Sequence, residues 1–168
     1  MTVIETERLI LRKMDFRDED NLMKIFSDPI AMRFYPSTKT REDAKKWIQW
    51  NLNNYEKHSA GLWICEFKEN GDFVGMCGIV PQIVDEQHEM EIGYLLVREH
   101  WGKGLATEAA KASRDFGFNV LKLNRLISMI YKLNTPSIRV AERVGMTFDK
   151  ETLIRGRETL VYSIEKSV

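Results

Sequence analysis

The most constraining part of the sequence runs from Glu91 to Ala109. Apolar residues up to Val97 are typical of a strand, Gly102-Lys103-Gly104 follows, and a helix-forming run begins at once. Successive N–H groups at a helix N-terminus form an anion site, and glycines let an anion approach the backbone closely. The pattern therefore fits a pyrophosphate-binding turn, although a simple tight turn between a strand and a helix has the same signature.

Two known phosphate-binding loops do not fit this stretch. The pattern Gly-x-x-x-x-Gly-Lys-Ser/Thr is absent, and Thr107 stands where Gly-x-Gly-x-x-Gly needs its third glycine. The sequence therefore does not support a kinase, a GTPase or a dinucleotide-dependent dehydrogenase.

The flanking segments predict alternating strands and helices. Asp15 with Asp18, and Thr40 with Asp43, are helix-start patterns. We expect a loop at 81–87 and helices after residues 15 and 40, at 106–118 and after Pro136; the expected strands are 9–11, 62–67, 73–80, 90–97, 125–131, around 148, and 159–164. This order predicts one α/β (α+β) domain over residues 1–168, built on a mixed sheet.

Composition removes several other classes. The 168 residues contain 25 Lys and Arg and 25 Asp and Glu, and this zero net charge argues against a general nucleic-acid binder. No apolar run approaches the roughly 18 residues of a membrane span, and the first residues do not resemble a signal peptide. We expect a cytoplasmic protein with no membrane partner and no metal. Cys65 and Cys77 lie in apolar runs and are expected to be reduced core thiols.

The zero net charge is the sum of two unlike blocks. Residues 69–97 contain six acids and no Lys or Arg, whereas residues 98–139 contain eight basic residues and three acids. Such a division either reflects ordinary solvated surface or indicates two ligand ends of opposite charge. We favour the second interpretation because the glycine turn lies in the basic block.

Four segments together carry a family resemblance. Trp101-Gly102-Lys103-Gly104-Leu105-Ala106 resembles the acetyl-CoA loop of the GNAT superfamily of N-acetyltransferases, with Trp101 in place of the usual Arg or Gln. That replacement, segment 6–12 and Glu91-Ile92-Gly93-Tyr94 resemble the ribosomal-protein N-terminal (Rim-type) subgroup, and segment 134–146 resembles the Asn-x-x-Ser helix of the GNAT family. The resemblance implies a single GNAT domain with a mostly antiparallel sheet of about six to seven strands, flanked by about four helices.

The resemblance also implies where acetyl-CoA binds as co-substrate. Its pantetheine arm would pair with the backbone of a strand, its pyrophosphate would lie on the glycine turn, and Arg139 would contact the 3′-phosphate. For Asn134 and Ser137 the alternative role is capping of a helix. The implied cofactor-binding residues are Leu95, Leu96, Val97, Gly102, Lys103, Gly104, Leu105, Ala106, Thr107, Asn134, Ser137 and Arg139.

The implied chemistry is direct attack of an amine on the thioester within a ternary complex. Glu91 matches the family's general base, with Glu89 and His88 as weaker candidates. A backbone N–H near Leu95 or Leu96 would stabilise the oxyanion. The usual acid, a helix tyrosine, is replaced by Ala141. Ser137 is our substitute, and a further candidate is Tyr131, although the thiolate can also leave without an acid, since a thiol pKa is already about 8.5.

The acceptor cannot be named from the sequence. A protein or peptide N-terminal α-amino group is the first choice. The alternatives are a small amine, such as a polyamine, an amino acid or an antibiotic, or a non-catalytic acyl-CoA-binding module. The segments 31–39, 81–87 and 150–157 are expected to select the acceptor, and either a monomer or a homodimer fits. Aromatic residues in the first helical region are expected to pack in the core rather than to grip a peptide; they are Phe34, Tyr35, Trp47 and Trp50.

Overall fold

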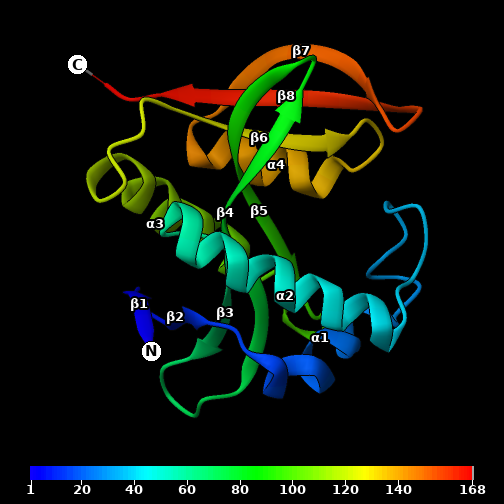
Figure 1. Cartoon of the computed structure of the whole chain (residues 1–168), viewed down its shortest axis with the longest axis vertical. Coiled ribbons are helices and arrows are strands. Elements are labelled where there is room, and N and C mark those ends of the chain that lie inside the picture. The colour runs from blue at the N-terminus through cyan, green and yellow to red at the C-terminus, as the bar shows by residue number, and fades with distance from the viewer. Residues whose placement is uncertain (168) are drawn as a thin grey trace.

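The computed structural model describes residues 1–167, and within them the chain forms one sheet of eight strands in the order β1-β2-β3-β4-β5-β6-β8-β7 (Figure 1). The strands are β1 (Thr2–Glu5), β2 (Leu9–Lys13), β3 (Leu62–Phe67), β4 (Phe73–Val84), β5 (Gln87–Leu96), β6 (Arg125–Tyr131), β7 (Thr147–Ile154) and β8 (Arg157–Glu165). The sequence analysis missed β1, a four-residue edge strand, and the sheet is therefore larger than the six to seven strands expected.

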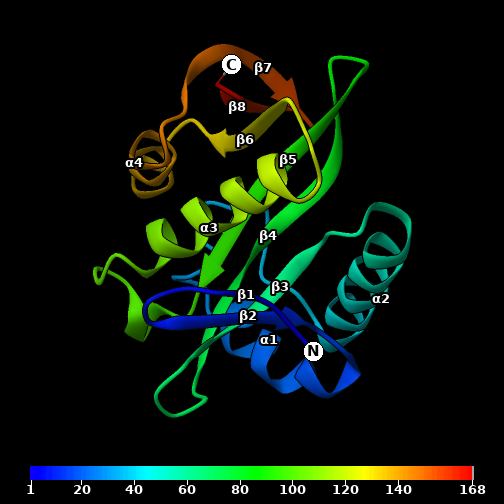
Figure 2. The same ribbon diagram turned by 90° about the vertical axis from the view of Figure 1, so that its left-hand side faces the viewer.

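Four α-helices flank the sheet within the described residues: α1 (Glu19–Phe26), α2 (Arg41–His58), α3 (Leu105–Asn119) and α4 (Thr135–Val144). Two short 3-10 turns, Phe16–Asp18 and Arg98–His100, complete the elements of this range. α2 lies on one side of the central strands, and α3 and α4 lie on the other (Figure 2). Every strand pairing is antiparallel except that of β5 with β6, which α3 connects. The predicted mixed α+β fold is confirmed.

Local sequence signals account for the helix boundaries. Thr40 and Asp43 form a reciprocal capping box at the start of α2, in which each side chain accepts a hydrogen bond from the other's backbone N–H. Asp15 and Asp18 form the same motif, which opens the 3-10 turn that leads into α1. Gly145 ends α4 in the left-handed region, with a φ of 100°. The predicted helix starts and the predicted glycine stop are therefore confirmed.

The loop expected at 81–87 is wrong. β4 continues through Pro81 to Val84, and the turn consists of Asp85 and Glu86 alone, both with positive φ. Proline lacks an N–H donor, which made a break at residue 81 plausible, but Pro81 keeps its place opposite Met90 in the ladder. The result is a long hairpin that carries β5 into the centre of the sheet.

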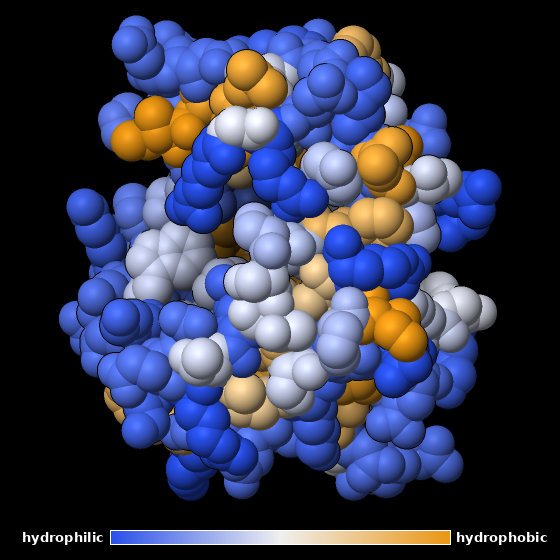
Figure 3. Space-filling view, turned by 90° about the vertical axis from the view of Figure 1, so that its right-hand side faces the viewer, coloured by the Kyte–Doolittle hydropathy of each residue, from blue (hydrophilic) through white to orange (hydrophobic). Residues whose placement is uncertain are grey.

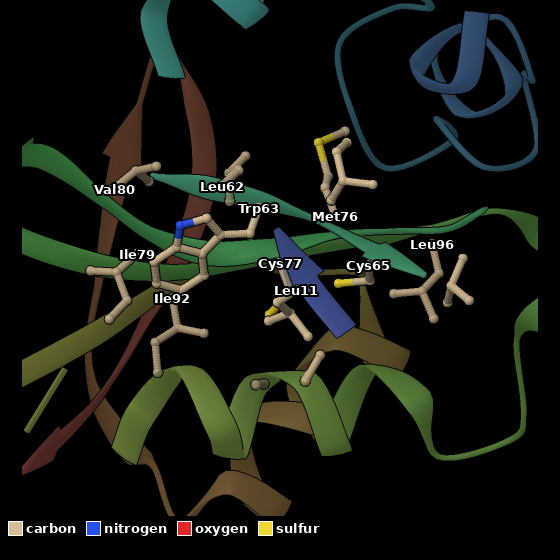
Figure 4. Packing of buried hydrophobic residues seen from close by; sticks show 14 of the residues in the cluster. Leu11, Leu62, Trp63, Cys65, Met76, Cys77, Ile79, Val80, Ile92 and Leu96 are labelled. Atoms are coloured by element: carbon tan, nitrogen blue, oxygen red, sulfur yellow. The ribbon is translucent and has the colours of Figure 1, made fainter. Parts of the chain in front are cut away.

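The core lies on both faces of this hairpin. Trp63, Ile79 and Ile92 point toward α3, while Leu62 and Met76 point to the opposite face (Figure 4). Trp47 packs edge-on against Phe26, with ring centroids 5.4 Å apart, and its indole N–H reaches the sulfur of Met76. Core packing is therefore observed for Trp47, as expected. None of the described helices is long and apolar enough to span a membrane.

Candidate active site

β5 and β6 separate like the prongs of a fork. Within residues 1–167 they have a single registered pair, Glu91 opposite Ile127. Just beyond it, the hydroxyl of Ser128 donates to the carbonyl of Ile92 at 2.8 Å. From there to Leu96, β5 keeps its partners in β4 but has no registered partner in the described part of β6. One edge of the β5 backbone is thus open to an extended ligand.

A cavity of about 480 Å³ lies at the open end of this fork. It is enclosed by the end of β5, the glycine turn with the start of α3, the first turns of α4, and the loop between α1 and α2. The face that carries this loop and the β7–β8 turn is hollowed near its centre within a largely hydrophilic rim (Figure 3). Ten predicted site residues line the cavity: Leu95, Leu96, Gly102, Gly104, Leu105, Ala106, Thr107, Asn134, Ser137 and Arg139.

The glycine turn has the geometry that an anion site requires. Gly102 and Gly104 have φ values of 76° and 77°, a left-handed conformation that favours glycine. Gly104 is the N-cap of α3, so the N–H groups of the following residues have no partner within the helix. A β-carbon at Gly102 would meet no atom within 4 Å. The turn is therefore open, and its donors fit the pyrophosphate of a bound nucleotide cofactor.

The N-terminal segment holds this turn in place. Glu108, in the first turn of α3, accepts hydrogen bonds from the hydroxyl of Thr6 at 2.6 Å and from Nε of Arg8 at 2.7 Å. Nη1 of Arg8 also donates to the carbonyl of Lys103 at 3.0 Å. Desolvation raises the pKa of Glu108, but the hydrogen bonds from Thr6 and Arg8 outweigh it and the net pKa is lowered. The arginine thus offsets a carboxylate that would otherwise repel a phosphate.

Two predicted cofactor residues do not line the cavity. The N–H of Val97 donates to the carbonyl of Val74 in β4 at 3.0 Å, so it is not free for a ligand in the fork. Lys103 is exposed, and its ammonium lies 3.4 Å from Nδ1 of His100. Trp101 supplies a different contact, because its indole N–H donates to the carbonyl of Leu96 at 3.0 Å.

Glu91 lies where the fork begins and uses both carboxylate oxygens. Oε1 accepts from Nε2 of Gln82 at 3.0 Å, and Oε2 accepts from the backbone N–H of Met129 at 2.7 Å. Desolvation raises the pKa of Glu91 to about 7, and these two hydrogen bonds oppose the rise. A carboxyl group that titrates near neutral pH suits a general base.

The weaker candidates for the base have other partners or another location. Glu89 makes a two-pronged ion pair with Arg125, with Nε–Oε1 and Nη2–Oε2 distances of 3.0 Å. His88 is exposed near the tip of the β4–β5 hairpin and does not line the cavity. Glu91 does not line the cavity either, but it lies at the start of the fork, and its carboxyl group has a raised pKa.

The start of α4 brings Asn134 and Ser137 to the cavity wall. The side chain of Asn134 accepts a hydrogen bond from the Ser137 N–H at 3.3 Å, so its capping role is observed. The hydroxyl of Tyr94 donates to the carbonyl of Ser137 at 2.7 Å, and burial raises the pKa of Tyr94. Ala141 is buried, as a small side chain at the usual tyrosine position. Tyr94 also lines the cavity. It belongs to the recognised motif Glu91-Ile92-Gly93-Tyr94, but its hydrogen bond to α4 was not predicted.

Sequence reasoning also missed two cationic residues of the lining. Arg143 follows Arg139 by one helical turn, a spacing that places both on one face of α4. Arg33 comes from the loop between α1 and α2, where no periodic pattern marks it. Phe34 lines the cavity rather than the core, contrary to the expectation for it, whereas Tyr35 lines the cavity and also packs against the core, as expected.

The three segments expected to select the acceptor contact one another. Asp85, at the β4–β5 turn, pairs with Lys150 at 2.8 Å and accepts from the hydroxyl of Thr152 at 2.7 Å. Arg157 at the start of β8 donates to the carbonyl of Phe34 at 3.0 Å. Segments far apart in the sequence are therefore joined at one side of the fork.

Within residues 1–167, the structure contains no exposed thiol and no cluster of side chains that would bind a metal ion. Cys65 and Cys77 are free and buried, and desolvation raises the pKa of Cys77 to about 12. Among residues 1–167, no three His, Cys, Asp or Glu side chains cluster in a way that would hold a metal ion.

The sequence and the fold are both similar to those of known proteins. Residues 8–147 match the family model described as Acetyltransferase (GNAT) domain. The chain is 37% identical over 160 residues to the uncharacterized N-acetyltransferase p20 of Bacillus licheniformis, covering 94% of this chain and 88% of that protein. It is 32% identical over 84 residues to spermidine N(1)-acetyltransferase of Escherichia coli (strain K12), covering 50% of this chain and 45% of that protein.

Solved structures show the same fold. An acetyltransferase from Agrobacterium tumefaciens str. C58 superimposes with a TM-score of 0.87 at 29% identity, over 99% of this chain and 95% of that one. RimL, a ribosomal L7/L12 alpha-N-protein acetyltransferase in complex with coenzyme A, gives a TM-score of 0.79 at 16% identity, over 98% of each chain.

Proposed function

The chain belongs to the GNAT acetyltransferase family and is an N-acetyltransferase, and we propose that its acceptor is the α-amino group of a protein or peptide N-terminus. Bound acetyl-CoA supplies the acetyl group as a thioester. The N–H groups of the glycine turn would hold its pyrophosphate, Arg139 and Arg143 would offset phosphate charge, and the open edge of β5 would pair with its pantetheine arm.

The charge of the cavity lining carries the choice of acceptor. Among the described residues, its charged side chains are Arg33, Arg139 and Arg143, and it contains no Asp or Glu. With Arg139 and Arg143 assigned to the phosphates, Arg33 remains for the acceptor; a polyamine with several positive charges would find no carboxylate on this wall and would be repelled by Arg33. An N-terminal amine flanked by neutral or acidic residues avoids that cost.

The pKa of Glu91 supports the same choice. An α-amino group has a pKa of about 8, whereas the amine of lysine has a pKa of about 10.4. Glu91 titrates near 7. Transfer of a proton from an α-ammonium to Glu91 is therefore uphill by about 1 pKa unit, or about 1.4 kcal/mol, against about 3.4 units, or about 4.6 kcal/mol, for a lysine-like amine.

The remaining catalytic roles follow from the cavity. Glu91 lies at the fork and not in the cavity lining, so it accepts the ammonium proton through a water molecule, and this leaves the neutral amine as nucleophile. A backbone N–H near Leu95 or Leu96 donates to the carbonyl oxygen as negative charge develops there. Ser137 is the first candidate to protonate the leaving thiolate, because it lines the cavity and Ala141 provides no hydroxyl.

A matched acceptor panel tests the proposal. The first acceptor is a peptide with a free N-terminus and no lysine. The second is that peptide with one lysine added and its N-terminus blocked. The third is spermidine. Thiol release and mass spectrometry report the products. We expect acetylation of the free N-terminus at the highest kcat/KM. Preferred acetylation of spermidine contradicts the choice of acceptor, and coenzyme A binding without thiol release across the panel supports a non-catalytic module.

A further inference from the structure

The loop between α1 and α2 crosses the open end of the fork. Its residues 33–35, which we name the strap, line the cavity. At one end the guanidinium of Arg33 stacks on Trp101, 5.1 Å from the ring centroid. The indole N–H of Trp101 donates a hydrogen bond to the carbonyl of Leu96, the last residue of β5. Further along the strap, the carbonyl of Phe34 accepts a hydrogen bond from Arg157, which lies beside Tyr131, the last residue of β6. The strap thus spans from one prong to the other.

Arg157 makes two contacts that suit a guanidinium. Its Nη1 donates to the backbone carbonyl of Phe34 at 3.0 Å. Its planar group lies 3.8 Å from the ring centroid of Tyr131, at the end of β6. A planar guanidinium can stack on a ring and donate in its own plane at the same time, which an ammonium cannot do. Arg157 therefore fixes the backbone of the strap to the β6 prong.

The next strap residue connects this anchor to the chemistry. Tyr35 lines the cavity, and its pKa is raised by desolvation and by the charge of Glu91, which places its phenol in the electrostatic field of the proposed base. Phe34 and Tyr35 are adjacent, so movement of the Phe34 carbonyl also moves Tyr35. Among the described residues, neither the glycine turn nor α4 makes a hydrogen bond to Arg157.

We infer that Arg157 is a positioning residue that holds the strap in the geometry that binds the acceptor, without taking part in the binding of acetyl-CoA. This inference rests on the proposed acetyl transfer to an amine for its kinetic test. The contact itself is a property of the free protein and can be tested without turnover.

The experiment compares Arg157→Met with Arg155→Met. Arg155 lies in the β7–β8 turn, two residues before Arg157; its side chain is exposed and, among the described residues, makes no hydrogen bond or ion pair, so both variants lose one positive charge and one tryptic site but Arg157→Met alone loses the contact with the strap. For Arg157→Met we expect the KM for the peptide acceptor to rise about tenfold, as for loss of one hydrogen bond, with the KM for acetyl-CoA within twofold of wild type. Arg155→Met should match wild type in both.

Limited trypsin digestion of the native protein provides the structural readout. Release of the strap should increase the rate of cleavage after Arg33 at least about fivefold in Arg157→Met, with no change in Arg155→Met. If Arg157→Met does not fold, Arg157→Lys takes its place, since it keeps the charge and loses the stacked planar group. The inference is overturned if cleavage after Arg33 matches the control, or if the KM values for both substrates rise together. Absence of turnover with every acceptor would refute the proposed function while the digestion still tests the anchor.

Discussion

Gln82 provides the sharpest test of Glu91 as the base. Its amide nitrogen donates to Oε1 of Glu91 at 3.0 Å, and this bond favours the charged carboxylate. Replacement by leucine keeps the volume similar but removes the donor. A hydrogen bond to a charged group contributes about 1.5–3 kcal/mol, and one pKa unit corresponds to about 1.36 kcal/mol. The Gln82→Leu variant should therefore raise the pKa of Glu91 by about 1–2 units.

This shift has a definite kinetic consequence. With a pKa of about 7, roughly half of the wild-type enzyme carries an ionised Glu91 at pH 7. In Gln82→Leu the ionised fraction at pH 7 falls to about 1–10%, so kcat/KM at pH 7 should fall by about 5- to 50-fold and recover as the pH rises. The assay is thiol release with the peptide acceptor between pH 6 and pH 9.5.

The control is Gln87→Leu, at the exposed start of β5 and on the same hairpin. Its pH profile should overlay that of wild type. A Gln82→Leu profile that keeps the wild-type midpoint would refute the role of Glu91 as a base tuned by this hydrogen bond. A uniform loss at every pH, together with a fall in Tm, would show that Gln82 contributes only to folding.

Three further predictions follow from the site. Because desolvation raises the pKa of Glu91 from 4.5 to about 7, the folded protein binds that proton more tightly than the unfolded chain, and the free energy of unfolding falls by about 3 kcal/mol as the pH rises through this window. Glu91→Gln should therefore abolish turnover yet raise the Tm at pH 8, as measured by calorimetry; an unchanged Tm contradicts the assigned pKa. Gly104→Ala should destabilise the fold by about 1 kcal/mol because its φ is positive, and should weaken coenzyme A binding in titration calorimetry. Arg143→Ala should weaken coenzyme A binding roughly fivefold, with the difference shrinking at high salt; equal affinity in both proteins removes Arg143 from the site.

Local signals in the sequence predicted much of this structure. The capping pairs at Asp15 and Thr40 and the stop at Gly145 act over a few residues, and all three are observed. The residues of the glycine turn that were expected to face a ligand do line a cavity, apart from Lys103. At the helix caps the neighbouring residues determine the geometry, whereas the glycine turn is also held by Thr6 and Arg8.

The contacts that the sequence did not reveal join distant segments. The bond from Met129 N–H to Glu91 depends on the register of β6 against β5, and the bond from Arg157 to Phe34 crosses 123 positions of the chain. The charge blocks illustrate the same limit. Arg125 lies in the basic block but forms ion pairs with Glu89 and Asp149, whereas Arg33 lies far outside that block and lines the cavity.

The attachment of the N-terminal segment to the glycine turn has a thermodynamic consequence. Thr6 and Arg8 lie between edge strand β1 and strand β2, yet they hold the first turn of α3 through Glu108. If a ligand binds more tightly to the ordered turn, it must also favour the docked N-terminal segment by the same coupling free energy, because linkage is reciprocal. The backbone N–H of Leu9 donates a hydrogen bond to the hydroxyl of Thr6, and its exchange rate should then report whether the cofactor is bound. Its hydrogen exchange should slow when coenzyme A is added, although Leu9 is buried and does not line the cavity.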